Sequence, residues 1–375
     1  MKKIFYAVLF VILASNVCWA DISTIVSSTG SVKSQFASGL GIGFYKTGSS
    51  EVGVMAWHPD FKFGYFGVGA DINITLGDKK PAEIENFVVR YVEYDTGRMG
   101  IKYGVLANMT LAYGMLMNNY STSIKGGSIL NSSQTGVRAY FKNDRFGVEA
   151  LGTKSNVYGA RISEKILPML VIGQSIAGDQ VQSGYSLDAG IPLNDWSGFY
   201  SEWAHLNNHG SGFSAGFGAG QNFGIFSWNF KAERRLLDSN FVPGYFNEQH
   251  DIDPINMASV EASGVKKDGY LAGLSGKFLD LASAAITYEN YNGGNPSLIG
   301  EVTAKYTDFF FYGNYSQPNF QDFRSLDFTQ GAVIFSKLGY KVNPLTMLIA
   351  NYKKAYDPAL GRVIESNWYE VQLNF

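Results

Sequence analysis

Cysteine, charged residues and proline are all scarce in this sequence. Cys18 is the single cysteine among 375 residues, so the chain cannot form a disulfide framework or a cluster of thiolate ligands. Charged residues make up 17%, against about 25% in ordinary soluble domains, and the formal net charge is −2. A chain with this balance lacks the basic face that nucleic-acid binding requires, so we expect no nucleic-acid partner.

Long apolar runs are also missing. Beyond the N-terminus no apolar run reaches the roughly 18 residues that a membrane-spanning helix needs, and the mean hydropathy is only −0.05. What the sequence does contain is 43 glycines and 15% aromatic residues, a composition that argues against disorder. We therefore expect a folded chain whose apolar residues are interleaved with polar ones.

The first residues have the pattern of a secretory signal peptide. Lys2 and Lys3 precede an apolar stretch over 4–14, and Ala20 ends a cleavage site of small residues. Cleavage after Ala20 removes 20 of the 375 residues, together with Cys18. A lipoprotein anchored at Cys18 is the weaker alternative, because a bulky valine stands before it where a small residue is required.

The C-terminus shows most clearly how the rest of the chain is patterned. Two faces alternate there, with Tyr369, Val371, Leu373 and Phe375 on the apolar face and Trp368, Glu370, Gln372 and Asn374 on the other. A period of two with one apolar face predicts a β-strand. The same split recurs along the chain, for example over 226–233 and 301–306, so we expect an all-β protein.

Two features favour a transmembrane barrel over a soluble sandwich, which would also alternate. Charges stand in mid-strand beside aromatic-rich apolar faces, as expected where strands separate lipid from a polar lumen. The three longest predicted connections, 107–133, 236–266 and 317–327, all follow odd-numbered strands and therefore share one end. We expect a single transmembrane antiparallel β-barrel over 38–375 with about 20 strands (16 and 18 are alternatives), short periplasmic turns and longer extracellular loops. Residues 21–37 then form a short periplasmic or lumenal segment.

On these residues the chain resembles the outer-membrane β-barrel proteins of Gram-negative bacteria, and the porin-like ones in particular. The resemblance implies location in the outer membrane, contact with its lipid, and an assembly signal read by the barrel assembly machinery at Tyr369, Val371, Leu373 and Phe375. It leaves a homo-oligomer, such as a trimer, open. General trimeric porins fold an acidic third loop against arginines, whereas loop 107–133 here contains Lys125 and no acid. The first part of this loop, 109–117, is predicted as a further strand or an inward-folded segment.

Charged residues on the polar faces are the candidate functional residues. In a water-filled lumen such charges stay hydrated, and their field can orient polar solutes in transit. The alternative is that they pair across neighbouring strands and only stabilise the wall. The predicted pore-lining residues are balanced in sign, so their count does not indicate selectivity for anions or for cations: Arg138, Glu149, Arg161, Glu202, Lys231, Glu233, Lys277, Glu289, Glu301, Lys305, Lys353 and Glu370.

Catalytic and metal-binding patterns are weak. His205 and His209 lie in a predicted outer loop, and no Gly-x-Ser-x-Gly motif or comparable nucleophile pattern accompanies them. Residues 250–253 in loop 236–266 offer oxygen ligands for Ca²⁺, but the glycine turn of an EF-hand is missing, so a solvated acidic loop is the simpler interpretation. We expect no enzyme, no cofactor and no metal site.

The sequence thus favours a porin-like outer-membrane channel for passive diffusion of small hydrophilic solutes, narrowed by one or both of loops 107–133 and 236–266. The alternative is a non-channel surface protein, an adhesin or structural anchor, that binds a partner through its long loops. Phe241, Tyr245 and Phe246 are the best candidates for such a contact. A barrel hydrolase is a third hypothesis and requires His205 or His209 to lie beside a serine or aspartate at the rim.

Overall fold

The computed structural model describes most of the chain between Gly39 and Leu373. The described residues are 39–47, 50–77, 80–122, 134–247, 250–251, 255–261, 266–294, 296–317, 320, 332–343, 346–357 and 362–373. The predicted signal peptide (1–20), the segment 21–37 and Phe375 lie outside them.

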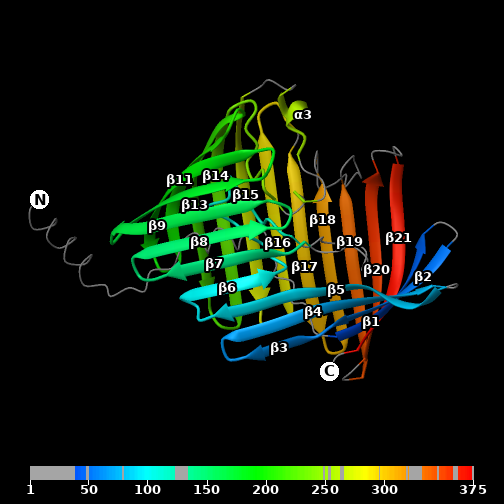
Figure 1. Cartoon of the computed structure of the whole chain (residues 1–375). Coiled ribbons are helices and arrows are strands. Elements are labelled where there is room, and N and C mark those ends of the chain that lie inside the picture. The colour runs from blue at the N-terminus through cyan, green and yellow to red at the C-terminus, as the bar shows by residue number, and fades with distance from the viewer. Residues whose placement is uncertain are drawn as a thin grey trace, which may run out of the picture.

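Strands make up nearly all of the described structure (Figure 1). They are β1 (Gly39–Thr47), β2 (Ser50–His58), β3 (Asp60–Phe63), β4 (Phe66–Gly77), β5 (Lys80–Asp95), β6 (Met99–Gly104), β7 (Gly136–Lys142), β8 (Phe146–Thr153), β9 (Tyr158–Leu167), β10 (Leu170–Gly178), β11 (Ser183–Asn194), β12 (Ser197–Leu206), β13 (Gly210–Asn222), β14 (Phe226–Leu237), β15 (Lys267–Phe278), β16 (Ala282–Tyr291), β17 (Ser297–Tyr306), β18 (Phe309–Gln317), β19 (Val333–Asn343), β20 (Thr346–Asp357) and β21 (Arg362–Leu373). A short helix, α3 (Met257–Glu261), precedes β15. No helix in the described part of the chain is long and apolar enough to cross a membrane.

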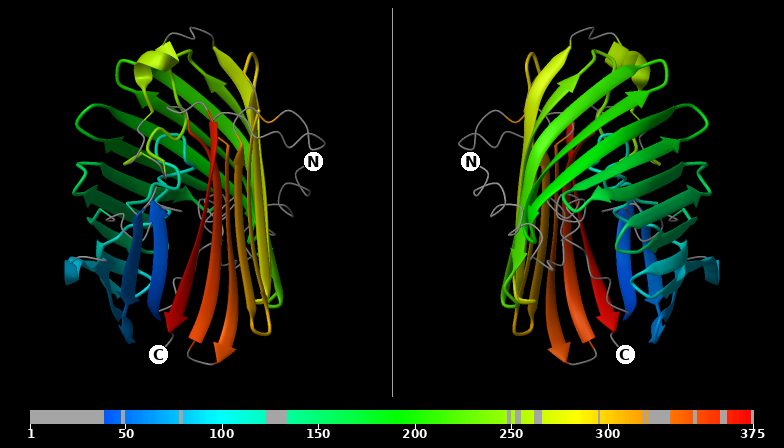
Figure 2. Two further views of the ribbon diagram at one scale, coloured as in Figure 1. Left: turned by 90° about the vertical axis from the view of Figure 1, so that its right-hand side faces the viewer. Right: turned by 90° about the vertical axis from the view of Figure 1, so that its left-hand side faces the viewer.

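The strands pair into one antiparallel ring. β1 pairs with β2 on one side and with β21 on the other, so strands from the two ends of the chain lie together (Figure 2). β2 pairs with β4, and from β4 onward each strand pairs with the next. The sheet contains 21 strands, and counting β2 and β3 as one interrupted strand leaves an even number around the ring, as in single-chain outer-membrane barrels. This confirms the predicted all-β antiparallel barrel.

Pro59 marks the interruption between β2 and β3. The sequence suggested a turn near this proline, but the chain continues straight and reverses later, at Gly64, where φ is +59°. Trp57 of β2 pairs with Ile72, and Asp60 of β3 pairs with Gly69, so the register on β4 is unchanged across the proline. Proline cannot donate a ladder hydrogen bond, which explains a break in pairing without a change of direction.

Connections of different length lie at opposite ends of the ring. Short turns such as 143–145 and 279–281 join β7 to β8 and β15 to β16 at what we call the turn end. The longest connections, β6–β7, β14–β15 and β18–β19, lie at the other end, the loop end. Outer-membrane barrels have short periplasmic turns and long extracellular loops, and this alternation matches the one predicted.

The outward faces of the strands are apolar and exposed. Ile101 is 53% exposed, Phe199 52%, and Leu274 and Leu338 are each 51% exposed, whereas Glu202 on the inner face of β12 is 0% exposed. Soluble monomers rarely display contiguous apolar surface beyond a few hundred Å². An apolar outward face of this kind, on the strands whose side chains the structure describes, is explained by lipid, which accepts apolar side chains and requires every backbone group to be paired within the barrel.

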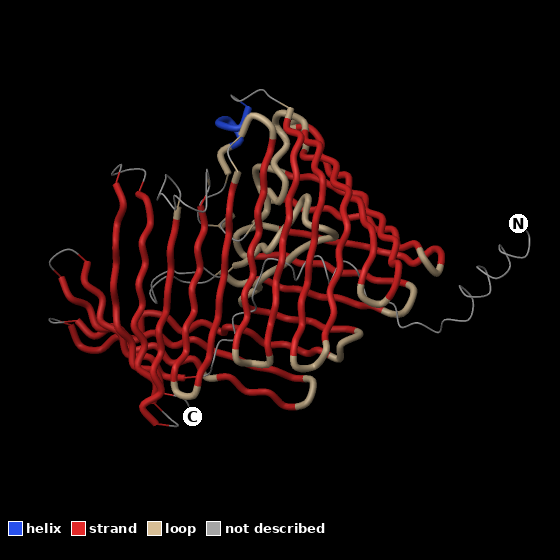
Figure 3. Tube along the Cα trace, turned by 180° about the vertical axis from the view of Figure 1, so that it is seen from behind, coloured by secondary structure: helices blue, strands red, loops and turns tan. Residues whose placement is uncertain are grey.

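The interior is occupied unevenly. In Figure 1, β7–β9 run across the view while β18–β21 stand upright, and Figure 3 shows loop segments in tan enclosed by the strands. These segments pack against the inner face of β7–β16, which we call the filled arc. Strands β17–β21 form what we call the opposite arc, and β1–β6 connect the two arcs through the pairings of β1 with β21 and of β6 with β7.

Candidate functional site

Residues 105–122, which follow β6, fold into the barrel instead of extending away from it. Met109 and Tyr120 exchange backbone hydrogen bonds of 2.8 Å, which closes the segment into a hairpin. The side chains are mostly apolar, and those that are 0% exposed include Leu111, Met115, Leu116, Met117 and Tyr120. Burial of this apolar surface is the driving force that holds the segment inside.

A second segment, residues 238–247 with 250–251, packs on the first. The backbone N–H of Gly244 donates to the carbonyl of Met115 at 2.9 Å, and that of Asn118 donates to the carbonyl of Phe246 at 2.9 Å. Phe241 and Phe246 are both 0% exposed and belong to the same hydrophobic cluster as residues 105–122. We call the two segments together the plug. Both loops that the sequence suggested as narrowing elements therefore lie partly inside the barrel.

Glycines in the wall make room for the plug. A Cβ atom on Gly159 of β9 would come within 3.0 Å of Leu111 Cδ1, and one on Gly184 of β11 within 2.8 Å of Leu116 Cδ1. On Gly212 of β13 it would come within 2.5 Å of Phe241 Cε1. Separations below 3.0 Å are essentially never found for real Cβ atoms, and 3.0 Å is tighter than most of them, so the missing side chains on alternate strands form the seat of the plug.

Glu202 on β12 binds the tip of the plug. Its Oε2 accepts hydrogen bonds from the backbone N–H groups of Tyr113 at 3.0 Å and Met115 at 3.1 Å. The backbone is sharply turned here, with φ of +50° at Ala112 and +95° at Gly114. Successive N–H groups in such a turn form a concavity that binds anions, and here a carboxylate of the chain itself occupies it.

Paired charges continue along the inner face of the filled arc. Tyr113 stacks on Tyr200 with ring centroids 4.5 Å apart, and the hydroxyl of Tyr200 donates to Glu233 Oε2 at 2.9 Å. Glu233 forms an ion pair with Arg235, whose Nη1 also lies 2.7 Å from Glu289 Oε1. Buried charges are tolerated where each has such partners, and removal of one partner leaves the others unpaired.

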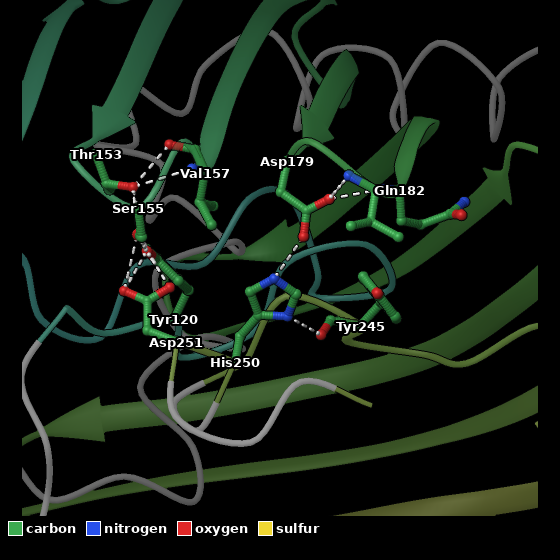
Figure 4. A network of polar contacts seen from close by, with 10 residues as sticks. Tyr120, Thr153, Ser155, Val157, Asp179, Gln182, Tyr245, His250 and Asp251 are labelled. Atoms are coloured by element: carbon green, nitrogen blue, oxygen red, sulfur yellow. Dashed lines mark hydrogen bonds and ion pairs between the residues drawn. The ribbon is translucent and has the colours of Figure 1, made fainter. Parts of the chain in front are cut away.

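His250 ties the plug to the wall at the loop end (Figure 4). Its Nε2 lies 2.9 Å from Asp179 Oδ2 in the β10–β11 connection, and its Nδ1 lies 3.2 Å from the carbonyl oxygen of Tyr245. Both neighbours are acceptors, and a neutral imidazole can donate to only one of them at a time. The imidazole is 5% exposed, so these contacts are shielded from water.

Asp251 makes the adjoining contacts. Tyr120 Oη donates to its carboxylate at 3.0 Å, and Ser155 Oγ in the β8–β9 connection donates to the same carboxylate at 3.0 Å. Burial raises the pKa of Tyr120, so its hydroxyl keeps the proton that it donates. Residues 250 and 251 therefore join both plug segments to two connections of the loop end (Figure 4).

The inner face of the opposite arc keeps more contact with water. Lys305 is exposed, and Asn314 and Lys337 are half-buried. Glu301 and Asn351 are the more enclosed members, at 7% and 3% exposure. Polar and charged side chains that remain wetted on the inward side of a lipid-facing sheet are typical of an aqueous lumen.

Most of the predicted pore-lining residues on β7–β14 are paired or covered. Arg138 Nε lies 2.7 Å from Glu149 Oε1, and both side chains stay partly exposed. Arg161 Nη2 lies 2.7 Å from Asp188 Oδ1, largely out of water. Three predicted residues, Glu202, Lys231 and Glu233, are at most 4% exposed. Glu202 binds the plug directly, and Glu233 reaches it through Tyr200, which stacks on Tyr113. The role of the group as pore lining stays a prediction.

The remaining predicted residues are spread over β15–β21. Lys277 pairs with Asp280 at 2.8 Å beside the turn end, and Glu301 accepts a hydrogen bond of 2.7 Å from Tyr312. Glu289 belongs to the Arg235 network, Lys305 is exposed and Lys353 is half-buried. For Glu370 the structure describes the backbone alone, paired with Ile349 and Gly43.

His205 lies beside a serine, which is the geometry that the hydrolase hypothesis requires. His205 Nδ1 lies 3.0 Å from Ser211 Oγ on neighbouring strands. His205 also stacks on Trp203, with ring centroids 6.2 Å apart, on the lipid-facing side. Among the described contacts, no acid or amide orients its other ring nitrogen, which a catalytic serine–histidine pair requires. The described residues also contain no group of three or more His, Cys, Asp or Glu side chains that could hold a metal ion.

The ring of antiparallel strands, the apolar outward face and the polar inward face define an outer-membrane β-barrel with loop segments folded into its interior. No protein-family model and no curated protein matches the sequence.

Solved structures show a distant likeness over most of the chain. Pseudomonas aeruginosa OccK11 (OpdR) is 12% identical, with 90% of this chain and 95% of that chain covered and a TM-score of 0.42. A BenF-like porin from Pseudomonas fluorescens is 10% identical over 90% and 97%, with a TM-score of 0.42. Wzi, a carbohydrate-binding outer-membrane β-barrel involved in capsule assembly in Escherichia coli, is 9% identical over 90% and 85%, with a TM-score of 0.40.

Proposed function

We propose that the protein is a porin-like channel for passive diffusion of small hydrophilic solutes across the outer membrane. The observation that carries this proposal is the difference between the two arcs. The plug covers the inner face of the filled arc, while polar side chains of the opposite arc, such as Lys305 and Lys337, keep contact with water. The solute path then runs between the plug and the opposite arc.

The expected mechanism is diffusion through a hydrated passage of mixed charge. Lys305 and Lys337 on the opposite arc, with Arg138 and Glu149 at the edge of the filled arc, are the accessible charges beside this path. Such side chains replace part of the hydration of a polar solute and orient it, without the tight binding that would prevent its release.

Bilayer recording tests this proposal directly. We expect the purified, folded barrel to give discrete single-channel current steps in planar lipid bilayers. A barrel shown to be folded, for instance by its resistance to unfolding in detergent at room temperature, but giving no steps would contradict the channel proposal.

The aromatic residues that favoured a surface-binding protein are buried inside the barrel. Phe241, Tyr245 and Phe246, the aromatic residues proposed for a partner contact, are at most 3% exposed because they pack into the plug. They are therefore not displayed to a partner outside the cell. We propose no catalytic role, because the His205–Ser211 pair lacks the further groups that hydrolysis needs.

Assembly into the membrane is proposed to use the C-terminal strand. Tyr369 is 69% exposed on the outward face of β21, and Val371 is half-buried two residues later. These positions fit the alternating apolar signal expected at Tyr369, Val371, Leu373 and Phe375. Recognition by the barrel assembly machinery, a trimeric or other homo-oligomeric state, and removal of residues 1–20 remain predictions of the sequence.

A further inference from the structure

Glu202 is an unusual group for the wall of a barrel. It is 0% exposed, and its Oε1 makes no hydrogen bond while Oε2 accepts two. Asp188, which stands directly opposite on β11, is a second acid and is paired with Arg161. Burying a carboxylate beside another acid is unfavourable for the stability of the wall alone.

Two hydrogen bonds from the tip of the plug compensate for the burial of Glu202. The two N–H groups that bind Glu202 belong to Tyr113 and Met115, on either side of Gly114. They are backbone groups at a turn, where a buried N–H without a partner is itself costly. Ala112 adopts φ of +50°, an unfavourable conformation for a residue with a side chain, and such conformations persist where the surroundings hold them.

We propose that Glu202 is the positioning residue of the channel constriction: its carboxylate fixes the turn at 112–115 against the wall and thereby sets how far the plug extends into the lumen. The proposal rests on the channel function for its consequence, but not for the position of the plug. Apolar packing supplies the attraction between plug and wall, and Glu202 supplies the fixed point, because hydrogen bonds are directional and apolar contacts are not.

A thiol-accessibility experiment tests the position of the plug without reference to transport. A Leu116→Cys reporter in a Cys18→Ser background places a single cysteine at a plug position that is 0% exposed. We expect a water-soluble maleimide to label it slowly when Glu202 is present and at least about tenfold faster in Glu202→Leu, because an opening equilibrium shifted by about 1.4 kcal/mol changes exposure tenfold. Glu202→Gln retains an uncharged acceptor oxygen, so its labelling rate should fall between the two.

Glu164→Gln is the matched control. Glu164 is also a strand carboxylate, on β9, but it is exposed and pairs with Arg145 at 2.8 Å. Its removal should leave the labelling rate of the reporter unchanged. Slow labelling in a folded Glu202→Leu barrel, equal to that of the Glu164→Gln control, would overturn the proposal.

Single-channel conductance tests whether the position of the plug affects transport. We expect larger and noisier current steps from Glu202→Leu than from the wild type and from the Glu164→Gln control, because a plug tip that is no longer fixed to the wall leaves the lumen wider and less constant. If no variant conducts while labelling still depends on Glu202, the channel function fails and the positioning role stands. If conductance is present but independent of Glu202, the positioning role fails.

Discussion

The two arcs of this barrel are built from the same kind of strand but have different inner faces. Where the plug rests on the filled arc, the wall has Gly159, Gly184 and Gly212, which leave space for its side chains. On β18 and β19 of the opposite arc, the inward pair Tyr312 and Lys337 is larger, although Gly339 faces inward as well. Small residues on the inner face of the filled arc thus mark where the plug packs.

The charged residues on the inner face also differ between the filled arc and the opposite arc. On the filled arc Glu233, Arg235 and Glu289 form an ion-pair network in which Glu233 and Arg235 are each 3% exposed and Glu289 is half-buried. On the opposite arc Lys305 and Lys337 lie in wetted positions. A buried charge is costly once its partner is removed, whereas a hydrated charge is available to ions in the channel that we propose. The same residue types thus serve different purposes on the two sides.

Removal of the plug should give the largest effect. Replacing residues 106–121 by a short Gly-Ser linker exposes the filled arc to the lumen, so we expect single-channel conductance to rise several-fold, since conductance grows with the open cross-section. Bilayer recording measures the change. An unchanged conductance would mean that the plug does not narrow the ion path and that the two arcs do not differ in function.

Loss of the central arginine should strongly destabilise the filled arc. Arg235→Leu leaves Glu233 and Glu289 without their cation, and breaking a buried pair in this way costs about 3–5 kcal/mol. Lys337→Leu on the opposite arc is the control, for which we expect less than about 1 kcal/mol. Urea unfolding in detergent micelles or lipid vesicles gives both values, and equal losses would remove the proposed distinction between buried and wetted charges.

Gly212 and Gly300 provide a matched test of whether wall glycines make room for the plug. A Cβ on Gly212 would clash with Phe241 and Met115, whereas one on Gly300 of β17 meets nothing within 4 Å. We expect Gly212→Ala to destabilise the barrel by about 1–3 kcal/mol through overpacking and Gly300→Ala to be nearly neutral. The unfolding free energies of the two variants decide the point, and a neutral Gly212→Ala would show that the plug does not rest where the wall is smallest.

Reversing charges on the opposite arc should change selectivity with little change in stability. Lys305→Glu and Lys337→Glu add negative charge beside the proposed path, so the reversal potential in a salt gradient should shift toward cation preference. Glu164→Gln, which alters an exposed pair beside the turn end, serves as the reference. A reversal potential that does not move would place the ion path elsewhere.

The sequence predicted the barrel well because alternation is a local property. The period of two over residues such as 301–306 and 369–375 fixes which side chains face lipid, and each strand carries that information by itself. Pro59 was misleading, because a proline between two strand segments signals a turn locally while the neighbouring strand β4 keeps the chain straight.

The plug could be predicted only in part, because its position depends on contacts distant in sequence. The apolar stretch 109–117 was recognisable as a strand or an inward-folded segment, and the second alternative is the one observed. Nothing local to Glu202 showed that it would bind Tyr113 and Met115, which are 89 and 87 residues away. The alternation correctly placed Glu202 on the inner face but not beneath another segment.

Blocking of the current by a thiol reagent tests the difference between the arcs most directly. Two single-cysteine variants are compared in a Cys18→Ser background: Lys337→Cys on the opposite arc and Ser214→Cys, a position that is 0% exposed on the filled arc. A bulky charged methanethiosulfonate added during bilayer recording should reduce the current in steps for Lys337→Cys and leave Ser214→Cys unchanged. Block of Ser214→Cys with no effect on Lys337→Cys would contradict the account, because the water path would then run along the arc that the plug covers.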